Sequence, residues 1–302
     1  MFRIKEDIQL LTQNQIGVLY MVGSVICFSI MDICVKWLDY YPVGQVLFLR
    51  FFIGFIPIFF IIPRDKILTF YKTSRPGLHA FRAICGALAI IALFYGLREL
   101  PLADVVSLTF AGPIFVTIAS IFFLSETVGI KRWFAVFLGF IGMLLIVQPA
   151  FVDLNYYYIS PIIFCIFFAC VAISVRSLSK TEANYTIAFY FTLLCTILGL
   201  CSIFFVDWVM PTKIDFLIFV VMALCGSIAN LLLTQSYRLA EASLVTPIKY
   251  LSLVFAIGFG FLIWSEIPKV LTLLGASLVI LSSLIIFIRE SQLKKQIIAP
   301  RS

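Results

Sequence analysis

The chain has 302 residues, of which 63% are hydrophobic and 12% charged, a composition outside the range of soluble globular proteins. A water-soluble fold would lack the polar residues to cover its surface, and an outer-membrane barrel would show short alternating strands where this chain has long apolar runs. The net charge of +7 comes from basic residues scattered between those runs, so it indicates no nucleic-acid partner. The composition predicts an all-α polytopic membrane protein.

Ten apolar runs are candidates for helices that span the lipid bilayer. They cover residues 16–38, 43–62, 78–97, 102–124, 132–149, 158–175, 185–206, 214–235, 242–264 and 269–288. No small-residue cleavage site follows the first run, so we expect this span to be retained rather than removed as a signal peptide. All eight cysteines lie inside the runs without C-x-x-C spacing, which predicts buried thiols and no disulfide framework.

The connections between the runs differ in charge. With the N-terminus placed inside, the inner segments hold 15 Lys and Arg residues and the outer segments hold four. Because cytoplasmic segments of membrane proteins carry the excess of basic residues, the sequence predicts an inner-membrane protein with both termini in the cytoplasm.

The chain also repeats itself with an offset of 140 residues. The shift places Lys36 on Arg176, Phe51 on Phe191, Arg98 on Arg238, and Ser125-Glu126 on Ser265-Glu266. Each copy holds five spans, an odd number, so the second copy must be inverted relative to the first, as in secondary transporters. The expected domains are a cytoplasmic tail at 1–15, a first repeat at 16–149, a second, inverted repeat at 158–288, and a cytoplasmic tail at 289–302.

The sequence lacks the residues that several kinds of catalytic and metal-binding site require. His79 is the single histidine, which argues against multi-His metal sites and His-based catalytic triads, and no phosphate-binding G-x-x-x-x-G-K-[ST] loop is present. The sequence therefore predicts no metal, no cofactor and no enzyme activity. Transport by such a chain would be secondary or facilitated.

Charged residues at membrane depth are candidates for function because they are costly in lipid. Lys36, Arg98 and Glu266 have counterparts in the other repeat and lie near span ends, which suggests architectural roles. Asp32, Arg50 and Lys249 have uncharged counterparts, Ala172, Tyr190 and Thr109, so the repeat does not require them. Asp32 and Arg50 are expected at similar depth, where they would form a salt bridge or contact substrate. Lys249 has no evident partner except Glu126, which favours a position facing a cavity. Arg82 lies near an inner boundary and is expected to reach lipid headgroups.

Two spans are interrupted by proline. Pro113 breaks the fourth span and Pro247 the ninth, and each frees a backbone carbonyl that needs a partner. Such breaks either form part of a substrate site, as in many transporters, or serve only the packing of helices. Neutral polar groups near them extend the list of candidate substrate-binding residues, which we set at Asp32, Arg50, Thr109, Asn230, Gln235, Lys249 and Tyr250.

Particular stretches resemble a known family. The ten-span inverted repeat, with L-F-L-R-F-F around Arg50, P-L-A-D-V-V-S-L-T-F-A-G-P-I-F-V-T at 101–117 and the two S-E pairs, is similar to the drug/metabolite transporter superfamily, EamA type. T-S-R-P-G-L-H-A-F-R at 73–82 and P-I-K-Y-L-S-L-V at 247–254 look like S-adenosylmethionine uptake transporters, whereas P-L-A-D at 101–104 and T-E-A-N-Y-T-I-A-F-Y-F at 181–191 look more like riboflavin transporters. Relatives of the second kind tend to carry an acidic residue where this chain has Lys249. The resemblance implies a central cavity lined by the first, third, fourth, sixth, eighth and ninth spans.

These observations predict a secondary transporter that moves a small polar or zwitterionic organic metabolite by alternating access. S-adenosylmethionine or a similar zwitterion is the leading candidate, because Lys249 and Arg50 suit a carboxylate and Asp32 suits a cationic group. Uptake of riboflavin or another vitamin and efflux of amino acids or drugs are alternatives within the same fold. A membrane-embedded enzyme and a structural subunit are the alternatives outside transport. The expected partners are a small-molecule substrate and the bilayer; proton or counter-substrate coupling and homodimer formation stay open.

The charge asymmetry generates a topology prediction. A reporter fused after Ser302 is expected to behave as cytoplasmic, and one inserted between Phe151 and Tyr156 as external, because basic residues are retained on the inner side. Paired phosphatase and fluorescent-protein fusions measure this. The same signal at both positions would contradict the inverted repeat, and exchanged signals would contradict the cytoplasmic placement of the termini.

Overall fold

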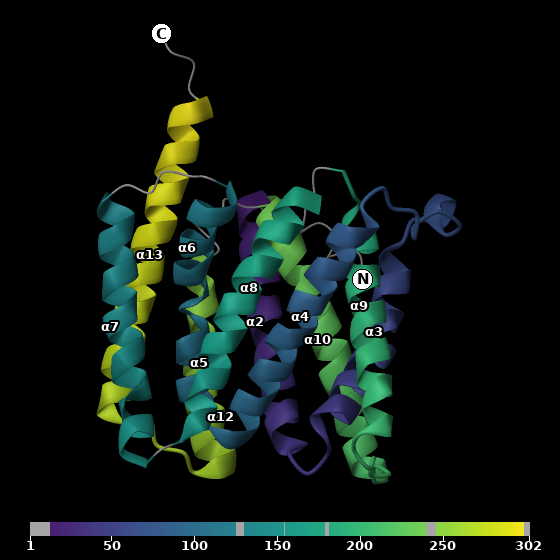
Figure 1. Cartoon of the computed structure of the whole chain (residues 1–302), viewed down its shortest axis with the longest axis horizontal. Coiled ribbons are helices and arrows are strands. Elements are labelled where there is room, and N and C mark those ends of the chain that lie inside the picture. The colour runs from purple at the N-terminus through teal and green to yellow at the C-terminus, as the bar shows by residue number, and fades with distance from the viewer. Residues whose placement is uncertain (1–12, 125–129, 154, 179–180, 240–245, 299–302) are drawn as a thin grey trace, which may run out of the picture.

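The computed structural model describes residues 13–124, 130–153, 155–178, 181–239 and 246–298, all of them in helices or short connections (Figure 1). The α-helices of the first half are α2 (Gln13–Trp37), α3 (Val43–Ile61), α4 (Pro76–Glu99), α5 (Leu102–Thr109), α6 (Gly112–Leu124) and α7 (Ile130–Asp153). Those of the second half are α8 (Ile159–Leu178), α9 (Asn184–Cys201), α10 (Lys213–Leu239), α12 (Leu251–Trp264) and α13 (Val270–Ile298). Short 3₁₀ turns lie at η1 (Arg64–Lys66), η2 (Tyr156–Tyr158), η3 (Ser202–Phe204) and η4 (Thr246–Tyr250).

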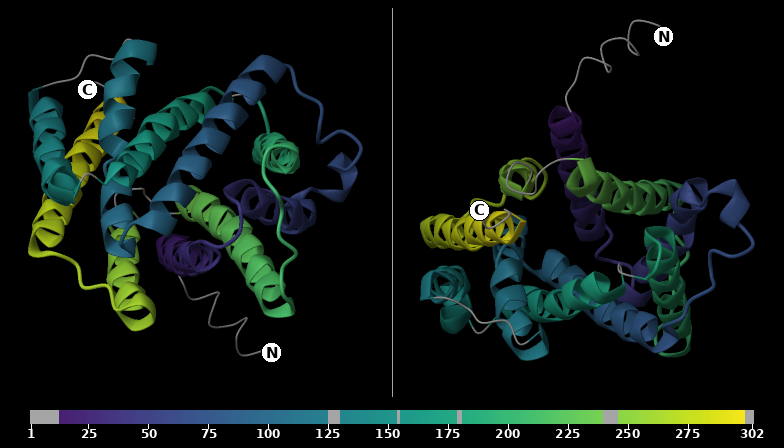
Figure 2. Two further views of the ribbon diagram at one scale, coloured as in Figure 1. Left: turned by 60° about the horizontal axis from the view of Figure 1, so that its bottom comes forward. Right: turned by 90° about the horizontal axis from the view of Figure 1, so that it is seen from above.

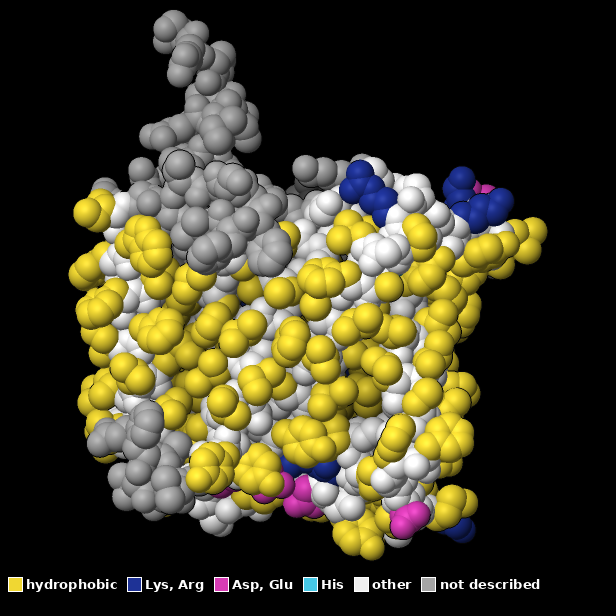
Figure 3. Space-filling model, in the orientation of Figure 1, with side chains coloured by type: hydrophobic (Ala, Val, Ile, Leu, Met, Phe, Trp, Pro, Cys, Tyr) yellow, Lys and Arg dark blue, Asp and Glu magenta, His cyan; other side chains and the backbone are white. Residues whose placement is uncertain are grey.

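The helices confirm an all-α polytopic membrane fold. Within the described residues, seven segments are long and apolar enough to cross a membrane, and three shorter apolar helices, Trp133–Val147, Ile248–Trp264 and Val270–Ile285, occupy the fifth, ninth and tenth predicted spans. Apolar side chains cover the middle of the molecule, and charged groups gather toward its two ends (Figure 3). This distribution is the one expected for helices that present hydrophobic residues to lipid.

Hydrogen bonds between connections show that the halves are antiparallel. The Gln45 amide, at the start of α3, exchanges two hydrogen bonds with the backbone of Val209, beyond the end of α9, at 2.6 and 3.0 Å. At the opposite end, the Thr73 hydroxyl, after α3, donates to Glu182, just before α9, at 2.8 Å. Helix α3 therefore begins where α9 ends, and the two copies are inverted.

Packing follows the 140-residue repeat. The contact of α4 with α8 has its counterpart in the contact of α10 with α2, and the contact of α3 with α10 has its counterpart in that of α9 with α4. Two helices also pack on their own counterparts, α3 on α9 and α7 on α13. Seen from above, the α7–α13 pair lies at one end of the molecule, away from α3 and α9 (Figure 2). A residue can touch its own counterpart only at the symmetry axis. Phe51 meets Phe191, and Phe110 meets Tyr250, each with ring centroids 5.1 Å apart, so these two contacts mark the pseudo-two-fold axis.

Glycine allows the α7–α13 contact to be close. A Cβ atom on Gly275 would lie 2.5 Å from the carbonyl oxygen of Gly142, and one on Gly142 would lie 2.7 Å from that of Gly275. On the same pair of helices, the Ser282 hydroxyl donates to the Ala135 carbonyl at 2.6 Å. Small residues and a hydroxyl donor thus take the place of bulky apolar packing, as is common between helices in lipid.

We expect Gly275→Ala to destabilise the protein by about 1–3 kcal/mol, because backbone atoms cannot move aside as a flexible side chain can. Gly258→Ala is the matched control: it lies in α12 with nothing within 4 Å of its added Cβ, and helix propensity alone should stabilise it by up to about 1 kcal/mol. Thermal unfolding of both purified variants measures the difference. Equal stability would contradict the close approach of α7 and α13.

Candidate functional site

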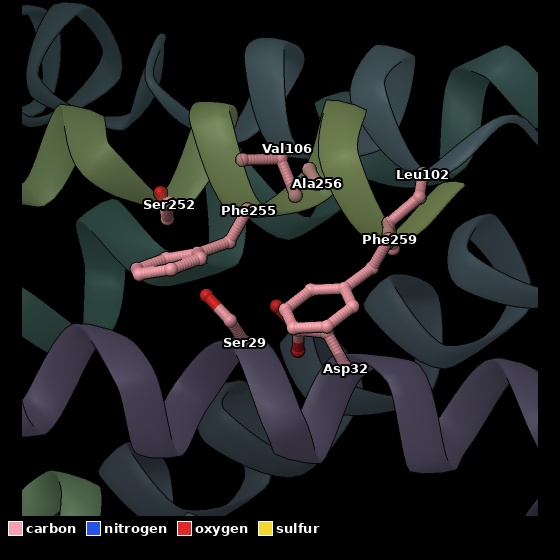
Figure 4. A pocket seen from close by; sticks show the side chains of 8 residues that line it. All are labelled: Ser29, Asp32, Leu102, Val106, Ser252, Phe255, Ala256 and Phe259. Carbon is pink, nitrogen blue, oxygen red and sulfur yellow. The ribbon is translucent and has the colours of Figure 1, made fainter. Parts of the chain in front are cut away.

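A narrow crevice lies between α2, α5 and α12. Its walls come from α2 (Ser29, Asp32), α5 (Leu102, Val106) and α12 (Ser252, Phe255, Ala256, Phe259), and in this conformation it is too narrow to hold a water molecule. Figure 4 shows Ser29 and Asp32 pointing from α2 toward the rings of Phe255 and Phe259. These rings stack with centroids 6.2 Å apart, so the crevice has an acidic wall and an aromatic wall.

Two polar atoms of the acidic wall are buried without hydrogen-bond partners among the described residues, Asp32 Oδ1 and Ser29 Oγ. Asp32 is close enough to Arg50 for their charges to interact, yet the two form no salt bridge in the described part of the chain. Instead the Arg50 guanidinium donates to Met31 Sδ at 3.0 Å and lies over the ring of Phe94. The Asp32 carboxylate thus retains an oxygen for another donor.

Beside the crevice, next to its lining residues Asp32 and Leu102, lies the contact that we call the Lys36–Glu266 lock. Lys36, one helical turn from Asp32 on α2, donates to the Glu266 carboxylate at 2.5 Å and to the Leu100 carbonyl at 2.6 Å. The other carboxylate oxygen of Glu266 accepts the Leu102 N–H, the orphan donor at the start of α5, at 2.9 Å. One acidic side chain therefore joins the ends of α2, α5 and α12, the three helices that line the crevice.

The backbone at the end of α12 aims Glu266 at this position. Ser265 adopts the left-handed conformation (φ 56°), and the N–H of Glu266 returns to the Gly260 carbonyl at 3.0 Å, which closes the helix with a Schellman-type turn. Gly260 leaves room for the returning side chain, since a Cβ atom there would lie 3.1 Å from Glu266 Oε2. The repeat counterpart Ser125-Glu126 lies outside the described residues.

Arg98 and Asp104 are engaged in the architecture near the lock. Arg98 donates to the carbonyls of Leu38, Asp39 and Tyr41 at the end of α2. Asp104 accepts the Tyr158 hydroxyl at 2.5 Å and the Thr272 hydroxyl at 2.8 Å, which ties α5 to η2 and α13. Asp104 is also part of a recess of about 220 Å³ with Lys269 and Asn155. Asp104 is the acidic residue of P-L-A-D, and the sequence alone gives no sign that it links three elements.

The two helix breaks face each other at the pseudo-two-fold axis. Helix α5 ends at Thr109 and α6 begins at Gly112, next to Pro113, while the ninth span starts with the 3₁₀ turn η4, which contains Pro247. Tyr250, at the end of η4, packs edge-on against Phe110 between α5 and α6.

Most carbonyls at the first break have protein partners. Phe110 accepts the Ser283 hydroxyl at 2.8 Å, and Leu108 the Cys165 thiol at 3.4 Å. Packing therefore accounts for the break at Pro113, and a direct contact between its carbonyls and substrate stays a prediction.

The remaining candidate residues occupy varied environments. Thr109 donates to the Val106 carbonyl at 2.7 Å, and the exposed Asn230 donates to the Gly226 carbonyl at 2.9 Å, so both form local bonds. Gln235 is half-buried on α10. Lys249 is half-buried in η4 and takes part in an interaction, so it is not the isolated charge that the sequence suggested. Its expected partner Glu126 lies outside the described residues.

Two of the four stretches that carried the subfamily resemblance, 73–82 and 181–191, meet at the end of the bundle opposite the lock. Glu182 accepts hydrogen bonds from the Thr73 hydroxyl and from the backbone and side chain of Ser74, at 2.8, 3.1 and 3.2 Å. Burial acts to raise the pKa of Glu182, but these hydrogen bonds outweigh it and hold the pKa below its usual value. The hydrogen bonds of Glu182 connect the α3–α4 connection to the start of α9, at a site remote from the crevice.

Apolar helices in two inverted sets define a polytopic membrane protein with the inverted-repeat architecture that many transporters share. The EamA-like transporter family model matches residues 15–148 and again 155–288. The chain belongs to this family.

Named relatives are similar over almost the whole chain. A pseudopaline exporter of Pseudomonas aeruginosa is 27% identical over 88% of this chain and 94% of its own length. A riboflavin transporter of Rhizobium johnstonii is 27% identical (93% and 93%), as is an S-adenosylmethionine uptake transporter of Rickettsia prowazekii (91% and 94%). A solved crystal structure has the same fold, with a TM-score of 0.64 at 14% identity, over 93% of this chain and 99% of the other.

The lock generates a stability prediction. Lys36→Met and Glu266→Gln should each destabilise the protein by about 3–5 kcal/mol, because each leaves a buried charge without its partner, and the double variant should recover much of that loss. The exposed pair Lys66–Asp65, at 4.0 Å, is the control, for which the same cycle should give less than about 1 kcal/mol. Thermal unfolding measures both cycles. Additive losses at Lys36 and Glu266 would contradict the lock.

Proposed function

We propose that this protein is an inner-membrane secondary transporter that moves a small polar or zwitterionic organic metabolite by alternating access, with both termini in the cytoplasm. The observation that carries the proposal is the unpaired carboxylate oxygen of Asp32 in a crevice directly behind the Lys36–Glu266 lock. A buried acid with no donor is unfavourable unless a ligand supplies one. Breaking the lock would open the crevice toward one side of the membrane.

A metabolite with a cationic group and a carboxylate is the leading substrate, with S-adenosylmethionine as the example. Asp32 and the Phe255–Phe259 pair suit a cation, since a carboxylate attracts positive charge and aromatic faces do the same. Arg50 suits a carboxylate, and Lys249 is a second candidate for that role. The name of the Rickettsia relative, an S-adenosylmethionine uptake transporter, agrees with this choice.

Two other relatives support alternatives within the same fold. The Rhizobium relative is named as a riboflavin transporter, which favours vitamin uptake, and the Pseudomonas relative is named as an exporter, which favours efflux. Membership in a transporter family sets aside the enzyme alternative. Uptake and counterflow assays in reconstituted vesicles, with labelled S-adenosylmethionine and riboflavin on either side, discriminate substrate and direction.

Asp32→Asn should fold like the wild-type protein and lose roughly 10- to 150-fold in substrate affinity, because one charge-assisted contact contributes about 1.5–3 kcal/mol. Since Asp32 and Arg50 form no salt bridge, the double variant Asp32→Asn/Arg50→Gln should fold and stay inactive. Thermal stability and vesicle uptake, measured for the wild type, both single variants and the double variant, test this. Recovery of uptake in the double variant would show a structural pair and remove Asp32 from the site.

A further inference from the structure

The connection between α3 and α4 projects sideways from the bundle. Residues 63–72, which we call the ledge, include η1 and extend beyond α3 and α9 (Figures 1 and 2). Hydrogen bonds of successive turns hold the ledge in shape. The N–H groups of Thr69 and Phe70 donate to the Lys66 carbonyl at 2.9 and 2.8 Å, and the Lys72 N–H donates to the Thr69 carbonyl at 3.0 Å. The ledge is therefore a run of ordered turns between two membrane-spanning helices.

The backbone of the ledge is fastened to α9, a helix of the other repeat. The Thr186 hydroxyl donates to the Phe70 carbonyl at 2.8 Å, and the Tyr190 hydroxyl donates to the Tyr71 carbonyl at 2.6 Å. The Phe70 ring packs perpendicularly against Phe189, with ring centroids 4.8 Å apart. Phe70 thus marks the side of the ledge that faces the bundle.

The other side of the ledge carries large apolar side chains that no described residue covers. Ile67, Leu68 and Tyr71 are 52%, 81% and 50% exposed. Their spacing places them on one side of a helical turn. Exposed apolar side chains next to a membrane span fit the boundary between the lipid headgroups and the acyl chains, where one face of a surface segment is buried in lipid.

The ledge also carries an excess of positive charge. Its sequence holds Arg64, Lys66 and Lys72 against the single acid Asp65. Both lysines are exposed, and Lys66 lies 4.0 Å from Asp65. Lys72 forms no salt bridge with any residue that the structure describes. At the corner of the molecule that holds the ledge, Lys and Arg side chains lie above apolar ones (Figure 3), so the charged and apolar groups are separated along the membrane normal.

We propose that the ledge lies in the headgroup layer of the membrane and binds anionic phospholipid. The apolar side chains enter the boundary of the acyl chains, and the lysines extend to the phosphates of the headgroups, as long basic side chains can do. Each lysine beside an anionic lipid surface contributes about a fivefold gain in affinity. A zwitterionic headgroup brings no net charge and would leave the excess uncompensated.

The ligand is lipid rather than a soluble anion, because a soluble anion would leave the apolar side of the ledge in water. The proposal goes beyond the proposed transport function and does not depend on it. It concerns a surface on the outside of the bundle, remote from the crevice.

The test places a tryptophan reporter on the ledge. Leu68→Trp in the full-length protein is reconstituted in phosphatidylcholine vesicles that contain phosphatidylglycerol or phosphatidylcholine with brominated acyl chains, at the same mole fraction. Bromine quenches tryptophan fluorescence only at short range, so quenching reports which lipid lies beside the reporter. The signal of the four native tryptophans is subtracted with the wild-type protein. We expect quenching by both lipids, and several-fold stronger quenching by phosphatidylglycerol. Leu144→Trp, exposed on α7, is the control reporter and should be quenched equally by the two.

Charge variants in the Leu68→Trp background test the role of the lysines. Lys66→Gln/Lys72→Gln should lose most of the preference for phosphatidylglycerol, at about fivefold per lysine, whereas Lys66→Arg/Lys72→Arg should keep it. Lys213→Gln/Lys269→Gln is the matched control, because it removes two exposed lysines near the end of the bundle where the lock lies, and it should keep the preference. Since all four lysines are exposed, each variant should unfold at the same temperature as the Leu68→Trp protein.

Four results would overturn the proposal. Absence of quenching at Leu68→Trp would place the ledge outside the lipid, and equal quenching by the two lipids would show no selection of anionic headgroups. An equal loss of preference in the ledge variant and in its matched control would show a general effect of charge. Loss of the preference in inorganic phosphate, but not in chloride at equal ionic strength, would identify a soluble anion as the ligand of the lysines. The assay needs no transport, so failure to find a transported metabolite would count against the proposed function alone.

Discussion

The constraint on which this structure depends is that polar groups in lipid must find partners inside the protein. The Lys36–Glu266 lock also satisfies the first N–H of α5, Arg98 satisfies the carbonyls at the end of α2, and Ser283 satisfies the carbonyl exposed by the break between α5 and α6. Each of these bonds joins segments far apart in the sequence. The bonds of Glu266 and Ser283 run from one repeat to the other, so backbone satisfaction also helps to hold the two repeats together.

Against this background three charged side chains stand out, because they are incompletely satisfied and also break the repeat. Asp32, Arg50 and Arg82 correspond to Ala172, Tyr190 and Met222 in the other half, and each has a buried polar atom without a hydrogen bond among the described residues. Symmetric positions build the scaffold, because a contact that works once works again in the inverted copy. The proposed function assigns the asymmetric charges to a ligand that has no such symmetry.

The sequence predicts the scaffold well for physical reasons. Span length, charge asymmetry and helix breaks are local properties, so the ten apolar segments and the interruptions beside Pro113 and Pro247 could be read directly. Contacts between segments that are distant in the sequence could not be predicted in this way. Depth along the span does not predict that the Arg82 side chain lies over the Phe191 ring, and the bonds from Asp104 to Tyr158 and Thr272 required knowing that η2 and α13 meet α5. Lys249 was judged by the absence of a partner in the sequence, which says nothing about partners in space.

The unsatisfied charges also explain how binding and stability oppose each other. A protein that leaves an acid and two arginines incompletely paired is less stable without ligand than one with apolar residues in their places. On the proposed function, a cationic group of the substrate would supply the donor that the buried oxygen of Asp32 lacks. Because Asp32 lies one helical turn from Lys36, a cation bound at Asp32 would lie beside a residue of the lock. It would repel the Lys36 ammonium, so substrate binding and the Lys36–Glu266 bond would be energetically coupled. This coupling requires only the spacing of two charges on α2.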